Sequence, residues 1–280
     1  MTEVAARDDL EASTGSATAL LRTVVGSILR PIGGWMSAAG AVRLMSDLGV
    51  PAATARSSLA RLCSRGVLRR EPRDGVAGYA LEPAAVPMLE RGDDRIFGDR
   101  VEATAWSLLS FSFPERSRGS RDRLRRRLSA LGCGTVADGL WIAPAALEDE
   151  LAATAHDIAG EADVVLFADA APRGDLGAGL ARWYDLEGIR RTHDAFLARF
   201  GAQAAPDDDA QAFALWIRAL DEWRVIPYRD PGLPSEALPA DWPGADSAAL
   251  FRRLRSDLED RAAVHAAAVA GPARSVAAAR

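Results

Sequence analysis

Residues 49–81 constrain the fold of this chain more than any other part of the sequence. Pro51 opens a helical segment at a first-turn position, where its missing N–H costs nothing, and Gly66 is a typical helix stop. Apolar residues recur within the segment at i, i+4 and i+7, namely Ala55, Leu59 and Leu62. This spacing places them on one side of a helix and predicts that this side is buried.

Two short strand-like runs follow the helix, at residues 67–70 and 78–81, with Asp74 and Gly75 between them. Asp-Gly between two such runs is typical of a tight β-hairpin turn. Another amphipathic helical pattern ends at Leu48, just before the segment that Pro51 opens. Helix, tight turn, helix and hairpin in this order predict a winged helix-turn-helix, a fold that lays its second helix in the major groove of DNA.

The polar face of the second helix and the hairpin carry the candidate DNA contacts. Arginine binds guanine through two hydrogen bonds or pairs with a phosphate. An ordinary solvated helix face is the alternative, but the position directly after the turn favours DNA, above all for Arg56 and Arg61. The predicted contacts are Thr54, Arg56, Ser57, Arg61, Arg65, Arg69, Arg70 and Arg73.

The charge of the chain is distributed unevenly. All 34 basic residues are arginine, which excludes a P-loop lysine or a Schiff-base lysine from this chain. The formal net charge is −5, yet residues 51–73 carry +5 and residues 116–127 carry +6, whereas residues 201–260 carry −6. Local basic segments decide whether a protein attracts nucleic acid, so the acidic total does not argue against DNA binding.

Residues 93–172 alternate between strand and helix patterns. Strands are expected at 105–113, within 132–139, at 140–143 and at 163–168, with one helix capped by Ser120 and another at 145–158. The order β-α-β-β-α-β is the ferredoxin-like, split-βαβ pattern.

The remaining pattern is helical, with segments at 180–200, 210–228 and 248–264. We therefore predict an α+β multidomain chain. Its parts are a disordered tail at 1–16, a winged helix at 17–92, a ferredoxin-like domain at 93–172, a helical effector and dimerisation domain at 173–265, and a mobile tail at 266–280. The last tail is rich in alanine and has little to bury.

Four motifs, taken together and in order, resemble the PaaX-like regulators, the repressors of phenylacetic acid degradation. They lie at residues 48–62, 124–142, 184–200 and 222–244. The first is common among winged-helix repressors, whereas the fourth, which contains Arg229-Asp230-Pro231 and Ala240-Asp241-Trp242, is specific. The resemblance extends from about Leu20 to Leu258.

This resemblance implies a winged helix, a central domain similar to the CRISPR-associated Cas2 fold, and a helical C-terminal domain. It also implies a homodimeric repressor of an aromatic or acyl-CoA catabolic operon, released from operator DNA by an acyl-CoA thioester such as phenylacetyl-CoA. Ser58 and Ala60 stand where we expect Ala and Ser, and Pro51 stands where a Ser or Thr cap is usual. Because of these departures, neither the operator sequence nor the identity of the regulated genes is predicted.

The effector site is the part that the sequence constrains least. The aromatic side chains of the C-terminal helical segments could line a pocket for an aryl-acyl group or could pack in the hydrophobic core. We favour the core for most of them. The arginines at 121–127 fit a longer DNA footprint, a site for coenzyme A phosphates, or a solvated helix face, with the last slightly favoured. The predicted effector contacts are Arg126, Trp183, Tyr184, Trp223 and Tyr228.

No catalytic residue, metal site or cofactor is predicted. His156, His193 and His265 show no metal-ligand spacing, and only Glu115 lies near the end of the first central strand, which disfavours a metal-dependent Cas2-like nuclease. That nuclease and a ligand-independent architectural DNA-binding protein are the alternatives.

The sequence shows no secretory signal and no run of apolar residues long enough to span a membrane. Cys63 and Cys133, far apart in sequence, are expected to be reduced, buried thiols of a cytoplasmic protein.

Overall fold

The computed structural model describes residues 14–98, 102–158 and 160–271. The chain divides into two compact units. Unit 1 is made of Met1–Asp94, Phe196–Trp223 and Ala248–Arg280, and unit 2 of Arg95–Ala195 and Arg224–Ser247. Unit 1 thus combines parts of the segments 17–92 and 173–265, which the sequence-based division assigns to separate domains.

Unit 1 begins with α2 (Ala17–Val24), which continues as a π-helical turn, η1 (Val25–Leu29). Two further helices follow, α3 (Ala38–Asp47) and α4 (Ala52–Ser64). Three short strands form an antiparallel sheet in the order β1-β3-β2. They are β1 (Trp35–Ser37), β2 (Leu68–Arg70) and β3 (Gly78–Leu81).

These elements confirm the predicted helices and hairpin, with one correction. Asp74 and Gly75 both have positive φ, 50° and 77°, which is the two-residue hairpin turn that Asp-Gly favours. Pro51 is the N-cap of α4, with an extended ψ of 143°, and not a first-turn residue. The prediction was wrong here because proline fixes only φ, and its φ of −59° suits both positions.

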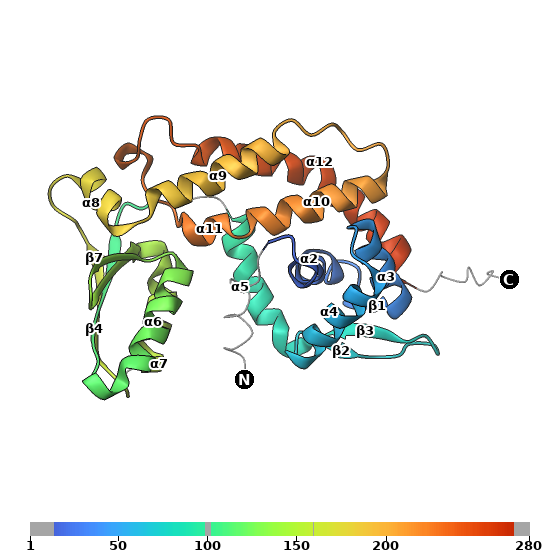
Figure 1. Cartoon of the computed structure of the whole chain (residues 1–280), viewed down its shortest axis with the longest axis horizontal. Helices are drawn as coiled ribbons and strands as arrows, with labels where there is room; N and C mark the ends of the chain where they lie inside the picture. Colours follow the sequence, from blue (N-terminus) through green and yellow to red (C-terminus); the bar gives the residue numbers. More distant parts are fainter. Residues whose placement is uncertain (1–13, 99–101, 159, 272–280) are drawn as a thin grey trace. The chain divides into compact units, whose positions relative to one another are not determined.

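The centre of unit 1 is α2, which is buried on nearly all sides, including the polar Thr18, Arg22 and Thr23. It lies between α4 and α10 (Asp209–Trp223), and Figure 1 shows α2 end-on between them. The Asp221 carboxylate of α10 accepts hydrogen bonds from the Gly15 N–H at 2.7 Å and from the Thr23 hydroxyl at 2.9 Å. A helix from the C-terminal half therefore completes the core of the N-terminal helices.

The last helix, α12 (Gly244–Ala270), corrects the predicted mobile tail at 266–280. Ala262, Ala266 and Ala270 recur at every fourth position and are at most 1% exposed. Gly40 of α3 packs so closely against α12 that an added Cβ would lie 2.6 Å from the Val269 carbonyl oxygen. The small side chains at the end of α12 therefore allow α3 and α12 to pack closely, although the sequence suggested that this end had too little to bury. Residues 272–280, and residues 1–13 of the predicted N-terminal tail, lie outside the described residues.

Unit 2 contains a four-stranded antiparallel sheet in the order β5-β6-β4-β7. Its strands are β4 (Trp106–Ser112), β5 (Gly134–Ala137), β6 (Leu140–Pro144) and β7 (Asp163–Ala170). Helices α6 (Arg118–Leu131) and α7 (Glu148–Ile158) pack on one face (Figure 1). The element order β-α-β-β-α-β is confirmed. Ser120 is not the cap of α6, which begins two residues earlier, at Arg118.

The opposite face of the sheet is covered by a second apolar cluster that includes Trp106, Ile142, Leu180 and Leu233. The predicted helix at 180–200 is in fact two helices, α8 (Leu176–Trp183) and α9 (Leu186–Phe200). Tyr184 breaks the run because its backbone is extended and its hydroxyl donates to the Ile142 carbonyl at 3.1 Å. The tertiary contact of one tyrosine overrides a continuous helical pattern.

Short elements connect the larger ones. The segment after the hairpin is a 3₁₀ turn, η2 (Pro83–Ala85), and α5 (Val86–Phe97), which runs through the boundary predicted at Asp93-Asp94. The predicted helix at 210–228 ends at Trp223 and is followed by α11 (Ile226–Arg229). Further 3₁₀ turns are η3 (Glu115–Ser117), η4 (Ala145–Leu147) and η5 (Ser235–Ala237). Among the described residues, no helix is both long and apolar enough to cross a membrane.

Candidate nucleic-acid interface

Helix α4 separates apolar and polar side chains sharply. Ala55, Leu59 and Leu62 are at most 1% exposed, as predicted. The predicted contact residues Thr54, Arg56, Ser57 and Arg61 are all exposed. The first turn contains no acidic residue, and no side chain caps its N–H groups. The start of α4 therefore keeps the partial positive charge that attracts phosphate.

The two serines in the middle of α4 have different roles. The Ser57 hydroxyl is exposed and donates to the Ala53 carbonyl at 3.1 Å, so its proton already has an acceptor within the helix. Ser58 is buried, and its hydroxyl lies 3.3 Å from that of Thr18 in α2. Ser58, which stands where the family resemblance predicts alanine, therefore belongs to the interior of the unit.

The hairpin arginines are organised around a residue that the sequence interpretation passed over, Glu71. Its carboxylate lies 2.7 Å from Arg73 Nε and 2.5 Å from Arg69 Nη2. Hydrogen bonds from Arg73, and then from Arg69, hold the pKa of Glu71 below its usual value. Arg69 also donates to the Leu81 carbonyl at 2.9 Å. Spacing by two along a strand, which puts 69, 71 and 73 on one face, was the signal for this cluster.

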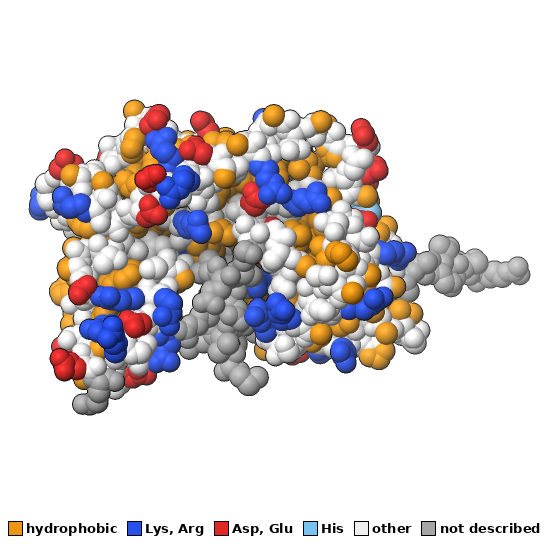
Figure 2. Space-filling model, in the orientation of Figure 1, with side chains coloured by type: hydrophobic (Ala, Val, Ile, Leu, Met, Phe, Trp, Pro, Cys, Tyr) orange, Lys and Arg blue, Asp and Glu red, His pale blue; other side chains and the backbone are white. Residues whose placement is uncertain are grey.

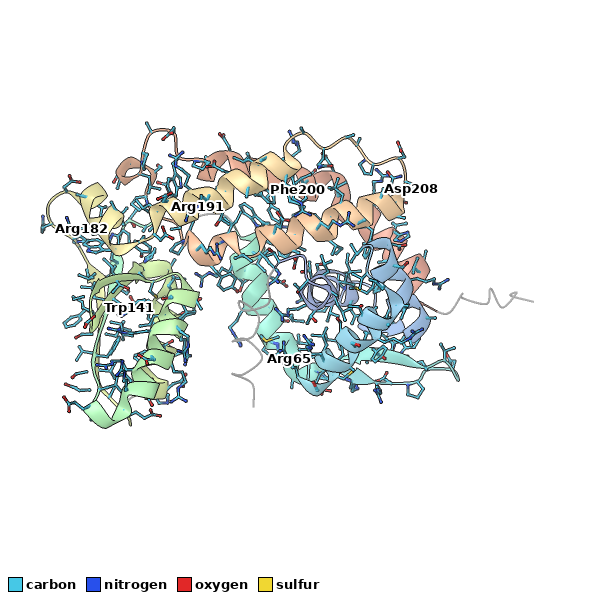
Figure 3. All side chains as sticks on the ribbon, viewed as in Figure 1. Arg65, Trp141, Arg182, Arg191, Phe200 and Asp208 are labelled. Atoms are coloured by element: carbon cyan, nitrogen blue, oxygen red, sulfur yellow. The ribbon has the colours of Figure 1, made fainter. Side chains whose placement is uncertain are left out.

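The arginines of this surface therefore fall into two groups. Arg69 and Arg73 are fixed by Glu71, and the Arg73 guanidinium also lies 5.4 Å from the centre of the Trp35 ring. Arg56, Arg61 and Arg70 are exposed and have no acidic partner within the described residues. Arg65 lies at the end of α4, beside the hairpin strands (Figure 3). The guanidinium groups of Arg56, Arg61 and Arg70 therefore add positive charge that no acidic side chain of the described residues offsets.

The structure does not bring the five predicted effector contacts together. Trp223 belongs to the core of unit 1, where its ring stacks on Phe251 at 4.5 Å. The other four lie in unit 2. Tyr184 is buried, which raises the pKa of its hydroxyl, whereas Arg126 is exposed on α6. Tyr228 lies under the Arg95 guanidinium at 4.3 Å, and Trp183 packs on the second apolar cluster.

A buried polar network in unit 2 also escaped the sequence interpretation, which gave His193 no specific partner. His193 Nε2 lies 3.0 Å from Asp230 Oδ2, and His193 Nδ1 lies 2.6 Å from Ser247 Oγ. Asp230 also accepts from Trp242 Nε1 at 3.3 Å and from the Leu233 N–H at 3.3 Å. No local sequence pattern signals this network, because His193 and Asp230 lie 37 positions apart in the sequence.

The network resembles the Asp-His-Ser arrangement of hydrolases only in its residue types. His193 is 1% exposed, Asp230 4% and Ser247 0%, so the serine hydroxyl is closed to any substrate. It donates instead to the Gly244 carbonyl at 3.0 Å. The network ties α9 to the loop after α11 and to the start of α12, which is a structural role.

The described residues hold no group of three histidine, cysteine or acidic side chains that is arranged to bind a metal ion. Both cysteines are free thiols. Cys133 is buried as predicted, and burial raises its pKa to about 12. Cys63, at the end of α4, is only half-buried, which corrects the prediction.

Three family models match the chain in sequence order. They are described as PaaX-like protein, at residues 16–84; PaaX protein central Cas2-like domain, at 101–177; and PaaX-like protein C-terminal domain, at 184–268. Among curated proteins, the chain is similar to the transcriptional repressor PaaX of Escherichia coli strain K12. The two are 25% identical over 246 residues, which cover 82% of this chain and 76% of the relative.

A solved structure shares the fold over most of the chain. It is the uncharacterized protein Rv0674 from Mycobacterium tuberculosis, with a TM-score of 0.57 and 24% sequence identity. The match covers 87% of this chain and 97% of that structure.

Proposed function

The chain belongs to the PaaX-like family of transcriptional regulators, and from this premise we propose that it is a repressor that binds operator DNA through α4 and the β2–β3 hairpin. In this proposal unit 1 is a winged helix, α4 is the recognition helix, and the hairpin is the wing. The protein regulates transcription and does not catalyse a reaction. Because it acts on chromosomal DNA, we assign it to the cytoplasm.

The observation that carries the proposal is the polar face of α4. Arg56 and Arg61 are exposed and unpaired within the described residues, and they project from a helix whose opposite face is fully buried. We assign base contacts to these two arginines and phosphate contacts to Arg70 and Thr54. Arg69 and Arg73, held by Glu71, support the wing against the minor groove or a phosphate.

The effector is proposed from the family. An acyl-CoA thioester, with phenylacetyl-CoA the first candidate, releases the protein from the operator of an aromatic or acyl-CoA catabolic operon. We propose a homodimer, in which two recognition helices match two half-sites and the effector favours a spacing that does not fit. Such a ligand acts only through its different affinities for the two states.

A mobility shift on the intergenic DNA upstream of the protein's own gene tests this function. We expect a retarded band that phenylacetyl-CoA removes, and that neither coenzyme A nor phenylacetate removes. A band that no acyl-CoA affects would leave a ligand-independent DNA-binding protein, and no band with any upstream DNA would refute the proposal.

A further inference from the structure

Helix α6 carries an unusual density of positive charge. Six of its fourteen residues are arginine and one is acidic. Arginines at i and i+3 or i+4, such as Arg118 with Arg121 and Arg121 with Arg125, repel one another. Arg118 is also the first helical residue, and the first turn contains no acid, so its charge opposes the helix dipole. The arginine–arginine pairs, and the position of Arg118 in the first turn, therefore act against the stability of α6.

Half of these arginines have acidic partners that offset this cost. Arg125 pairs with Asp138 at 2.9 Å, Arg127 with Asp157 at 2.7 Å, and Arg123 approaches Glu161 at 3.9 Å. The other three have no acidic partner within the described residues. They are Arg118, Arg121 and Arg126.

Two of the unpaired three, Arg118 and Arg126, lie on the solvent side of α6. Arg121 precedes Leu124 by three residues and Leu128 by seven, so it lies at the edge of the buried side. Arg118 and Arg126 are exposed, while Leu124 and Leu128 occupy the buried side of the helix. Arg121 is half-buried, and its Nε atom is buried without a hydrogen-bond partner. Figure 2 shows basic side chains gathered over the surface that α6 forms, with acidic side chains beside some of them.

The shape of this surface selects the kind of anion. Sites for small molecules are concave, whereas the outer face of a helix is convex and open. Arg118 and Arg126 are eight residues apart, which spans about 12 Å of helix. One strand of duplex DNA carries a charge at about every 3.4 Å along its axis, so several phosphates lie within that span. The guanidinium groups therefore suit a nucleic-acid backbone better than a single bound nucleotide.

We infer that α6 is a second DNA-contact surface, which binds backbone phosphates without reading the sequence, through the exposed Arg118 and Arg126 and the half-buried Arg121. The inference rests on the proposed function and deepens it, since it adds a phosphate-binding surface in unit 2 to the sequence-reading surface of α4. It also moves Arg126 from the effector contacts to the DNA contacts.

The test compares two triple variants of the full chain that lose the same charge. One is Arg118→Gln, Arg121→Gln, Arg126→Gln. The control is Arg182→Gln, Arg252→Gln, Arg253→Gln, three arginines that are exposed and lack an acidic partner within the described residues. Fluorescence anisotropy measures the affinity of each protein for the upstream duplex and for a scrambled duplex, at several salt concentrations.

Each phosphate contact contributes about 0.9 to the slope of log affinity against log salt. We expect the α6 variant to lower this slope by about 2 to 3 and to lose affinity for both duplexes by the same factor, while the control keeps the wild-type slope. An unchanged slope in the α6 variant, or an equal loss in the control, overturns the inference.

Two further outcomes separate this inference from the proposed function. If wild-type protein binds neither duplex, both fail. If the α6 variant keeps its salt slope but no longer responds to phenylacetyl-CoA, the arginines serve the effector, and the inference fails while the repressor proposal stands.

Discussion

At the scale of single residues, the arginines of unit 1 differ in what holds them. Arg56 and Arg61 of α4 are exposed, whereas Arg69 and Arg73 of the hairpin are bound to the Glu71 carboxylate. The outward positions follow from helical periodicity alone, so Arg56 and Arg61 were predictable. The Glu71 cluster follows from the alternation of side chains along a strand, which puts positions 69, 71 and 73 on one face. The run is short, and its simplest interpretation is that Arg69, Arg70 and Arg73 are three equivalent exposed side chains. The His193–Asp230 pair joins positions 37 residues apart, and no local pattern can reveal such a contact.

Glu71 provides a prediction about pH. Its pKa is lowered in the folded chain, so the carboxylate adds stability above the pKa of an unfolded glutamate, and this contribution is lost as pH falls through the lower folded pKa. Carboxyl carbon chemical shifts measured by NMR should show Arg73→Gln raising the pKa of Glu71 more than Arg69→Gln does. Equal titration of Glu71 in wild type and in both variants would contradict the cluster.

His193 provides a prediction about stability. His193→Ala leaves the buried Asp230 carboxylate with one hydrogen-bond partner fewer, and a buried polar group left unsatisfied costs about 1–3 kcal/mol, or more when it is charged. His156 is exposed, so His156→Ala is the matched control and should change the free energy of unfolding by less than about 0.5 kcal/mol. Urea unfolding of both variants gives the comparison, and similar midpoints for the two would refute a role for the network.

At the scale of elements, strong periodicity predicted where most helices and strands occur, but not where helices stop. The break between α8 and α9 depends on the hydrogen bond of Tyr184 to β6, which is a tertiary contact. The alanine-rich end of α12 looked too weakly hydrophobic to pack, yet its small side chains are what the close approach of Gly40 requires. In both places the neighbouring element decides the outcome, so local sequence carries little information.

The contact between α3 and α12 can be tested through Gly40. In Gly40→Ala the new Cβ would meet the backbone of α12, 2.6 Å from the Val269 oxygen and 2.8 Å from the Ala270 Cα. Overpacking of this kind costs about 1–3 kcal/mol. Gly92→Ala on α5 is the control, because a Cβ there meets nothing within 4 Å and alanine favours a helix. Thermal unfolding should separate the two variants, and a Gly40 variant as stable as wild type would show that α12 does not pack here.

At the scale of the whole molecule, the distribution of charge carries more information than the total. The acidic net charge of −5 conceals two basic segments, one on α4 and the hairpin and one on α6. The element order of unit 2 was predictable because its strands are short, apolar and separated by turns. The interleaving of unit 1 was not, since packing of α10 and α12 against the N-terminal helices joins segments that are remote in sequence.

The measurement that tests the central claim most directly is the affinity of Arg61→Gln for the upstream duplex and for a scrambled duplex at one fixed salt concentration. Arg253→Gln, which is also exposed, is the control for the lost charge. A base contact is worth about 1–3 kcal/mol of discrimination, so the Arg61 variant should lose most of its preference for the upstream duplex while the control retains it. Equal discrimination by wild type and the Arg61 variant would contradict sequence reading through α4.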